Sequence, residues 1–334
     1  MKIEEVFVLI FILVFGITAA GLKFFIPFLS SRKMGQKILD IGPRWHKNKE
    51  GTPTMGGIVF VFAAIISFFA FLIMIDKEKI EIRHMVFAFN IIIYALLNAM
   101  IGLIDDFSKL RKSKNQGLTG KAKFAFQSIA ALLFLLSMHF TIGISTKLYI
   151  PFFDVYVEMG ALYYVIAFIA LCGVVNSVNL TDGIDGLASS ITLTVGVFFA
   201  IVNIVLLKDF VLSYFSAMII GATLGFLVYN FYPAKIFMGD TGSLFLGALV
   251  VSLSFFIDNI LLVLIYGFIF VCEALSDVLQ VLYFKITKGK RLLKMAPLHH
   301  HFEKCGYNEV KIVLIFTLVN AVACFIAFLG LGKL

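Results

Sequence analysis

The sequence predicts an all-α protein that crosses a membrane about ten times. Hydrophobic residues make up 61% of the 334 residues, and charged residues only 14%. An ordinary soluble domain is roughly 45–50% apolar and about 25% charged. The apolar residues also gather in ten long stretches, and most basic residues lie between alternate stretches. These observations favour a single transmembrane domain over residues 1–334, with catalytic loops on the cytoplasmic side, rather than a soluble fold.

The ten stretches are candidate membrane-spanning helices, because about 20 apolar residues cross roughly 30 Å of hydrocarbon. We expect spans at 3–29, 53–75, 84–104, 124–140, 161–179, 187–207, 211–229, 243–257, 260–284 and 312–332. The eighth is the shortest, since Asp258-Asn259 separates it from the ninth. The first is longer than the apolar core of a signal peptide, about 7–15 residues, and lacks a clear small-x-small cleavage site. We therefore expect it to be retained as a helix.

The basic residues predict the orientation of these spans. The loops at 30–52, 105–123, 230–242 and 285–311 hold six, six, one and seven of the 28 Lys and Arg residues. Cytoplasmic loops are enriched in Lys and Arg, so these loops are expected in the cytoplasm and both termini outside. Basic residues beside a membrane also attract anionic lipids, so the bilayer is an expected partner. Nucleic acid is not, because the charge is spread over separate loops without a recognition module.

The third span ends in Asp105-Asp106, followed by Lys109, Lys121 and Lys123 in a predicted loop. An ionised carboxylate in or near hydrocarbon costs several kcal/mol, so a cluster there needs a partner. Neighbouring helical residues point about 100° apart, so one carboxylate can face a metal while the other faces a phosphate or a lysine. The lysines would contact phosphate oxygens. A pair that caps a helix or faces water is the alternative, since two adjacent aspartates are a weak signal alone.

A second cluster, Asn179-Leu-Thr-Asp182-Gly-Ile-Asp185-Gly186, follows the fifth span. Asp182 and Asp185 are three residues apart and would share a face if the segment were helical. The glycines allow a ligand to approach the backbone closely. A polar turn between two spans is the alternative, although a turn needs neither the asparagines nor the spaced aspartates.

The third cluster runs from Asn230 to Asp240 and contains Phe237. Glycines flank Asp240, which is typical of a loop built around an ion, although an ordinary interhelical loop is also compatible.

Three consecutive histidines, His299-His300-His301, lie in the most basic loop. They cannot all face one metal from a regular helix, which disfavours a zinc site. Contact with phosphate or proton transfer suits them better, because histidine titrates near neutral pH. An exposed structural turn is the alternative.

All of these segments, and a polar loop at 42–57 that includes Lys49 and Thr54, fall on the predicted cytoplasmic side. A divalent cation that carries phosphate groups would explain carboxylates and lysines gathered at one membrane face. The sequence therefore predicts an integral membrane enzyme that acts on a phosphorylated lipid.

The same segments resemble the family of phospho-N-acetylmuramoyl-pentapeptide transferases (MraY) over nearly the whole chain. Three motifs occur across the wider superfamily of polyprenyl-phosphate N-acetylhexosamine-1-phosphate transferases: the Asp105-Asp106 motif, the Asn179–Gly186 motif and the Phe237–Asp240 motif. Two others favour the muramoyl branch: Gly51-Thr-Pro-Thr-Met-Gly-Gly57 and Ala296-Pro-Leu-His-His-His-Phe-Glu303.

The resemblance implies a homodimer with a bent ninth helix in the bacterial cytoplasmic (inner) membrane. It also implies Mg²⁺-dependent transfer of phospho-MurNAc-pentapeptide from UDP-MurNAc-pentapeptide to undecaprenyl phosphate, which gives lipid I and UMP for peptidoglycan biosynthesis.

The resemblance also implies roles for individual residues. Asp240 would bind the metal, and Asp105 and Asp106 would be catalytic. Asn179, Asp182 and Asp185 would line the nucleotide site, with Phe237 stacked near uracil. Contacts to the nucleotide sugar or the phosphates would come from Lys49, Thr54, Lys109, Lys121, Asn230, His299 and His300, and the two histidines are also candidate catalytic groups. Asp277, inside the ninth span, has no role in this interpretation.

Two other functions are compatible with parts of the sequence. A GlcNAc-1-phosphate transferase of the same superfamily would share the first three motifs. A cation-coupled transporter would also carry intramembrane acids, but near the bilayer midplane on discontinuous helices. The acids here lie at the cytoplasmic ends of the spans. For the transfer itself we expect direct attack by the lipid phosphate, with a covalent aspartyl-phosphate through Asp106 as the alternative.

Overall fold

The computed structural model describes residues 2–32, 35, 49–76, 80–111 and 117–332, without the side chains of residues 110 and 111. Most of the basic loop predicted at 30–52 lies outside this range. The described helices are α1 (Ile3–Ser31), α2 (Gly57–Met74), α3 (Ile82–Arg111), α4 (Gly120–Ile142), α5 (Ala161–Thr181), α6 (Leu187–Val202), α7 (Phe210–Asn230), α8 (Gly239–Phe256), α9 (Val263–Tyr266), α10 (Phe268–Ile286), α11 (Leu298–Lys304) and α12 (Glu309–Leu329). The all-α prediction is confirmed.

The predicted membrane spans are also confirmed. Among the described residues, nine helices are long and apolar enough to cross a membrane, and the pair Ile260–Tyr266 and Phe268–Ile286, bent by 87°, makes up to ten. The bent pair is the predicted ninth span, so its bend agrees with the resemblance. The largest difference in boundary is at α3, which continues past residue 104 to Arg111. The sixth span runs from Leu187 to Leu207 as predicted, although its last residues, Asn203–Leu207, form a π-helical turn after α6.

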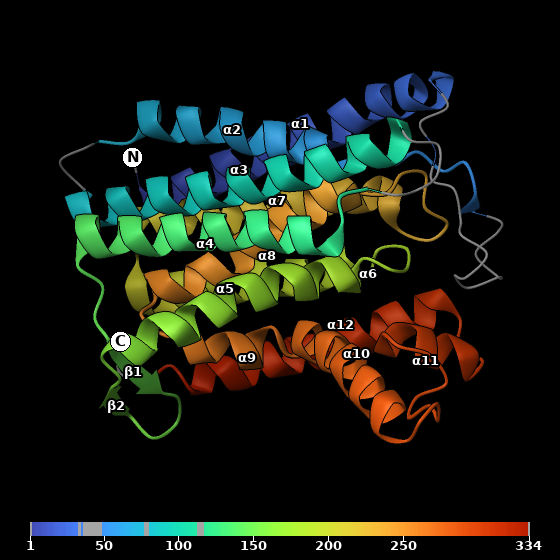
Figure 1. The fold of residues 1–334 in the computed structure, drawn as a ribbon. Coiled ribbons are helices and arrows are strands. Elements are labelled where there is room, and N and C mark those ends of the chain that lie inside the picture. The colour runs from blue at the N-terminus through green and yellow to red at the C-terminus, as the bar shows by residue number, and fades with distance from the viewer. Residues whose placement is uncertain (1, 33–34, 36–48, 77–79, 112–116, 333–334) are drawn as a thin grey trace.

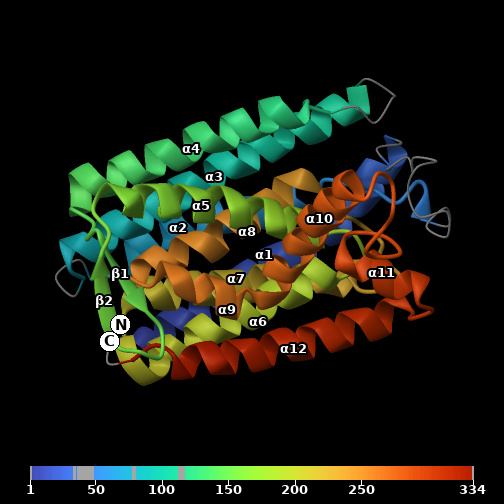
Figure 2. The same cartoon turned by 60° about the horizontal axis from the view of Figure 1, so that its bottom comes forward.

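The long helices lie side by side in one bundle, while α10 leaves it at a steep angle (Figure 1). Both termini lie at one end, beside a hairpin of antiparallel strands β1 (Lys147–Ile150) and β2 (Val155–Glu158) that the sequence did not predict. Helix α11 lies at the opposite end, and the second view agrees (Figure 2). One end of the bundle therefore carries both termini and the hairpin, and the other end carries α11.

Helices α7 and α8 form the centre of the bundle. In each of their spans 83% of the residues are buried, against 28% for α1. Small residues allow this close packing, since helices in lipid associate by van der Waals contact between closely approaching backbones. A β carbon on Gly225 of α7 would lie 2.9 Å from Cβ of Thr18 on α1. On α8, a β carbon on Gly247 would lie 2.8 Å from Cα of Val175 on α5.

The bend between α9 and α10 is stabilised by one side chain from α12. The break occurs at Gly267 and frees main-chain groups that water cannot satisfy inside a membrane. Asn320 replaces the missing partners: its Nδ2 donates to the carbonyl of Tyr266 at 3.0 Å, and its Oδ1 accepts from the amide of Ile269 at 3.2 Å. The same Nδ2 donates to Oγ1 of Thr194 at 2.7 Å, which ties the bend to α6.

Asn320→Leu should therefore destabilise the protein. The substitution keeps the volume similar but removes the acceptor of the Ile269 amide and leaves the Tyr266 carbonyl with only the weak donor Sγ of Cys324 at 3.5 Å. An unpaired buried group costs about 1–3 kcal/mol. Thermal unfolding of the purified protein in detergent measures the loss. Thr317→Val is the matched control on the same helix, because the Thr317 hydroxyl is buried without a hydrogen-bond partner among the described residues. Equal melting temperatures for the two variants would contradict this account of the bend.

Candidate active site

Two helices that are far apart in the sequence bring the aspartates together. Helix α3 carries Asp105 and Asp106, and the first turn of α8 carries Asp240. Gly102, one turn before Asp106, permits the contact, since a β carbon there would lie 2.2 Å from the carbonyl oxygen of Asp240. Gly57, at the start of α2, packs against α8 in the same way, with a β carbon only 2.4 Å from the amide nitrogen of Gly242. Glycines on α2 and α3 therefore set the position of the first turn of α8.

Asp106 binds the start of α8 directly. Its Oδ1 accepts from the amide of Asp240 at 3.0 Å, and its Oδ2 accepts from the amide and the hydroxyl of Thr241 at 2.9 and 2.7 Å. The first amides of a helix have no partner within the helix, and a negative charge there is favourable. Asp106 thus serves as an N-terminal cap supplied by another helix.

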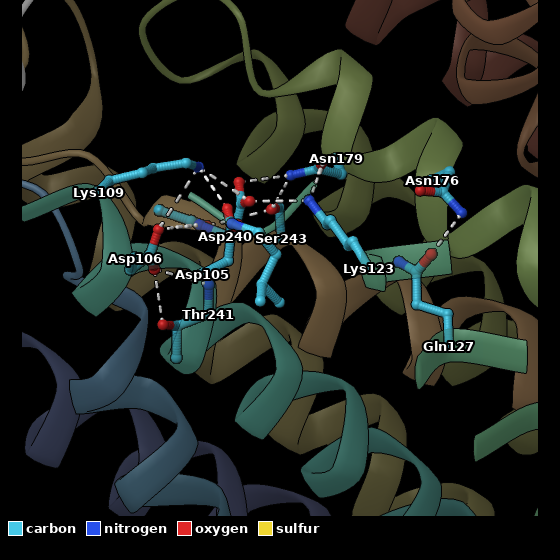
Figure 3. Close-up of polar contacts among 12 residues, drawn as sticks. Asp105, Asp106, Lys109, Lys123, Gln127, Asn176, Asn179, Asp240, Thr241 and Ser243 are labelled. Atoms are coloured by element: carbon cyan, nitrogen blue, oxygen red, sulfur yellow. Dashed lines mark hydrogen bonds and ion pairs between the residues drawn. The ribbon is translucent and has the colours of Figure 1, made fainter. Parts of the chain in front are cut away.

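Asp240 lies at the centre of a hydrogen-bonded cluster (Figure 3). Its Oδ2 contacts Nζ of Lys109 at 3.0 Å and Nζ of Lys123 at 2.7 Å, while its Oδ1 accepts from Nδ2 of Asn179 at 3.0 Å. Asn179 also accepts from Lys123 and donates to Ser243. The cluster therefore joins α3, α4, α5 and α8 around one carboxylate.

Asp105 completes a group of three carboxylates. Its Oδ2 lies 2.7 Å from Nζ of Lys109, and its Oδ1 accepts from the amide of Leu118 at 2.5 Å. One oxygen each from Asp105, Asp106 and Asp240 lie within 4.8 Å of one another. Carboxylate oxygens at this spacing fit a hard divalent cation such as Mg²⁺, which usually binds one or two carboxylates together with water and substrate phosphates.

The two aspartates between α5 and α6, Asp182 and Asp185, have different surroundings. The segment at 182–186 is a turn and not a helix, so the expectation of a shared helical face was wrong. Burial, followed by repulsion from Asp240, Asp106 and Asp185, raises the pKa of Asp182 well above its usual value. A further negative charge at Asp182 is therefore disfavoured beside the cluster.

Asp185 belongs to a separate ion pair. Its Oδ1 lies 2.6 Å from Nζ of Lys49, and its Oδ2 accepts from the amide of Ala234 at 2.8 Å. Glu309, the first residue of α12, contacts the same lysine at 2.5 Å and accepts from the amide of Asp185 at 3.1 Å. The segment before α2 is thereby tied to the turn after α5.

Asn230 and Phe237 shape the neighbouring loop. Asn230 is buried; it accepts from the amide of Gly186 at 3.1 Å and donates to the carbonyl of Ile236 at 2.9 Å. The amide of Phe237 donates to the carbonyl of Pro53 at 2.8 Å, and its ring is partly exposed. Thr54, next to Pro53, is partly buried beside this loop. Asn230 thus holds the loop through the backbone, while Phe237 and Thr54 remain partly exposed.

The histidines form a short helix, α11, that the sequence did not predict. His299 is fully buried, and its Nδ1 donates to Oε2 of Glu273 at 3.0 Å. His300 is largely buried and pairs with Glu303 at 2.6 Å through Nδ1. His301 accepts from the amide of Lys294 at 3.1 Å and does not share the environment of the other two. His299 reaches the turn at 182–186, because its Nε2 faces Gly183.

The structure brings most of the predicted residues to one end of the bundle. The predicted lysines, however, do not all contact the carboxylate cluster. Lys123 enters the carboxylate cluster, whereas Lys121 is exposed and makes no contact with the cluster within the described part of the chain. Sequence reasoning missed Glu273 and Glu309. An acid in the apolar ninth span was a usable signal for Glu273, because buried ionisable residues in membrane helices require partners. Asp277, one turn further along α10, interacts electrostatically with Glu273 and His299.

The comparisons with known proteins match most of the chain. The family description glycosyl transferase family 4 matches residues 88–258, and phospho-N-acetylmuramoyl-pentapeptide-transferase signature 1 matches residues 49–61. The chain is 46% identical to the phospho-N-acetylmuramoyl-pentapeptide-transferase of Clostridium acetobutylicum over 92% of this chain and 93% of the relative. It is 42% identical to the protein of that name from Listeria welshimeri, over 95% of both chains. For the protein of that name from Caldanaerobacter subterraneus, the identity is 40% over 96% of this chain and 97% of the relative.

Asp106→Asn should lower the stability of the protein more than Asp105→Asn does. An asparagine at 106 loses the charge and places an amide group against the donors of Thr241. Hydrogen bonds to charged groups contribute about 1.5–3 kcal/mol each, so a loss of roughly 2–3 kcal/mol is expected. Asp105 accepts no hydrogen bond from α8 among the described contacts and serves as the matched control. Thermal unfolding in detergent compares the two, and an equal or larger loss for Asp105→Asn would refute the capping role of Asp106.

Proposed function

The chain belongs to the family of phospho-N-acetylmuramoyl-pentapeptide transferases, and from this membership we propose its reaction in detail. It transfers phospho-MurNAc-pentapeptide from UDP-MurNAc-pentapeptide to undecaprenyl phosphate and releases UMP, so that lipid I is formed for peptidoglycan biosynthesis. The observation that carries the proposal is the three-carboxylate cluster, which lies within the matched family region beside the matched signature. The homodimer is part of the same proposal.

We place the carboxylate cluster at the cytoplasmic face of the bacterial inner membrane. Two observations support this orientation. The described parts of the basic loops, 105–111, 117–123 and 285–311, lie at the cluster end of the bundle, and both termini lie at the other end. Cytoplasmic loops are enriched in Lys and Arg. The water-soluble donor then reaches the site from the cytoplasm, while the lipid acceptor reaches it from the bilayer.

We propose Mg²⁺ as the cofactor, held by Asp240 together with Asp105. When bound, the ion neutralises charge on the donor diphosphate as the phosphorus–oxygen bond breaks. Lys109 and Lys123 contact Asp240 at 3.0 and 2.7 Å in the free protein. Both amines lie where they can turn to phosphate oxygens, so the site has its own cations for the transferred group. Asn179 holds the second oxygen of Asp240 and keeps its carboxylate oriented.

We propose that the lipid phosphate attacks the sugar-linked phosphorus directly. Asp106 is a poor candidate for a covalent intermediate, because both its oxygens accept hydrogen bonds from the first turn of α8. The acceptor also needs little help from a base. The second pKa of a phosphate monoester is about 6, so the acceptor is largely ionised at neutral pH. The principal task of the protein is then to hold the lipid phosphate and the donor diphosphate in line for the transfer.

The rival reaction is transfer of GlcNAc-1-phosphate, which shares the three aspartate motifs. The matched signature at 49–61 and the relatives named above favour the muramoyl donor. A transporter is disfavoured by the position of the cluster. Asp105, Asp106 and Asp240 lie at helix ends, whereas the discontinuous helix α9–α10 contributes none of the three.

The protein purified in detergent should release UMP when UDP-MurNAc-pentapeptide, undecaprenyl phosphate and Mg²⁺ are supplied together. UDP-GlcNAc in place of the donor should give little product. Asp240→Asn should abolish turnover, a loss of about a thousandfold or more, because it removes a charged metal ligand. Normal Mg²⁺-dependent turnover by a folded Asp240→Asn would contradict the assignment. A radiolabelled phospho-enzyme formed without lipid acceptor would contradict direct attack.

The raised pKa of Asp182 predicts how donor affinity changes with pH. Below that pKa the side chain is neutral, and above it a further negative charge lies beside Asp240 and Asp106 and repels the diphosphate. The kcat/KM for the donor should therefore fall as pH rises through the pKa of Asp182. Asp182→Asn stays neutral and should remove this fall while retaining turnover at lower pH. Identical pH profiles for the two proteins would show that Asp182 does not titrate in this range.

A further inference from the structure

A buried carboxylate that the proposed mechanism leaves unused lies on α10. Glu273 has no exposed surface. Both of its carboxylate oxygens face His299: the amide of His299 donates to Oε1 at 3.2 Å and to Oε2 at 3.4 Å, and Nδ1 donates to Oε2 at 3.0 Å. A buried acid in a membrane helix is costly and usually marks a functional contact. Among the described residues, the hydrogen bonds of the Glu273 carboxylate all come from this one histidine.

The opposite edge of the same ring faces the turn between α5 and α6. Nε2 of His299 is buried and has no hydrogen-bond partner among the described residues. It lies so close to Gly183 that a β carbon at that position would be 2.2 Å away. Buried polar side-chain atoms nearly always have a partner, so an unpaired ring nitrogen needs an explanation. Asp182 precedes Gly183 and Asp185 follows shortly after, so Nε2 abuts the turn that carries both predicted nucleotide contacts.

We propose that Glu273 is a positioning residue: its hydrogen bond to Nδ1 fixes the ring of His299 so that Nε2 remains directed at the 182–185 turn, where it bonds to the donor nucleotide. The inference rests on the proposed function. In the free protein Gly183 covers Nε2, and donor binding displaces the turn enough to expose it. The donor offers hydroxyls that donate to a neutral ring nitrogen and phosphate oxygens that accept from a protonated one.

A purely structural role makes a different prediction. If Glu273 only anchored α11 to α10, its hydrogen bond to the His299 ring would be sufficient and Nε2 would be irrelevant. An anchoring role therefore requires only Nδ1, whereas the positioning role also requires Nε2. The two roles also differ in whether a change at Glu273 alters the KM for one substrate or for both.

The first test is a comparison of Glu273→Gln with wild type under the UMP-release assay. We expect the KM for the nucleotide donor to rise about tenfold, which corresponds to the loss of one oriented hydrogen bond, with the KM for undecaprenyl phosphate unchanged. Asp277→Asn is the matched control on α10, because Asp277 interacts electrostatically with His299 without a hydrogen bond to it among the described contacts. The control should keep the wild-type constants. A donor KM that is unchanged in Glu273→Gln, or raised equally in Asp277→Asn, would overturn the proposal.

A second pair of variants decides the question if Glu273→Gln does not fold. His299→Asn keeps an amide near the Nδ1 position and can still donate to Glu273, but it has nothing at Nε2. His299→Gln places its amide near Nε2 instead. The positioning role predicts a raised donor KM for His299→Asn, whereas an anchoring role predicts a wild-type donor KM for that variant. A wild-type donor KM for His299→Asn would contradict the proposal.

A third measurement needs no substrate. In protein labelled with ¹⁵N-histidine, the His299 signal should show a proton held on Nδ1, and Glu273→Gln should convert it to a mixture of tautomers. The His299→Gln spectrum identifies the signal by its absence. An unchanged tautomer in Glu273→Gln would refute the positioning contact. If the wild-type protein shows the expected tautomer but releases no UMP, the proposed function fails, while the Glu273 contact stands.

Discussion

The contact between Asp106 and the first turn of α8 is the interaction on which the carboxylate cluster depends. Three hydrogen bonds from Asp240 and Thr241 end on this one side chain. They fix the helix start that carries Asp240, and Gly102 allows the two backbones to approach. This junction joins Asp240 on α8 to the two carboxylates of α3. The local chemistry is simple, since a carboxylate satisfies amides that a helix cannot satisfy itself.

The negative charges of the carboxylate cluster also need to be offset by nearby groups. Three carboxylates within 4.8 Å repel one another strongly at the edge of a membrane, where solvent screens little. Lys109 and Lys123 offset this repulsion in the free protein, and Asn179 contributes an oriented dipole. Beside them, burial and repulsion from the neighbouring carboxylates raise the pKa of Asp182 and so disfavour a further negative charge. Each carboxylate of the cluster is thereby held by a cation or a hydrogen-bond donor of the protein itself.

Much of the fold could be predicted from the sequence, because hydrophobic length and loop charge are strong signals in membrane proteins. The ends of α5, α7 and α8 lie within a few residues of the predicted spans, and the aspartate motifs meet as expected. The details of orientation could not be predicted. Lys121 and Lys123 lie on one helix, and only the packing of α4 against α5 decides which one reaches Asp240. The role of Glu273 depends on His299, which is 26 residues away and lies on a helix whose sequence resembles a loop.

The partners of the adjacent aspartates have a consequence for co-translational insertion. The bond between Lys109 and Asp105 is internal to α3, at 2.7 Å and four residues apart, so this acid is neutralised as soon as the helix leaves the translocon. The hydrogen-bond donors of Asp106 all lie on α8, about 134 residues later in synthesis. Until α8 emerges, the partner of Asp106 within α3 is Lys109, whose Nζ lies 4.0 Å from Oδ1. Docking of α8 is therefore the step in synthesis that supplies Asp106 with its hydrogen-bond donors.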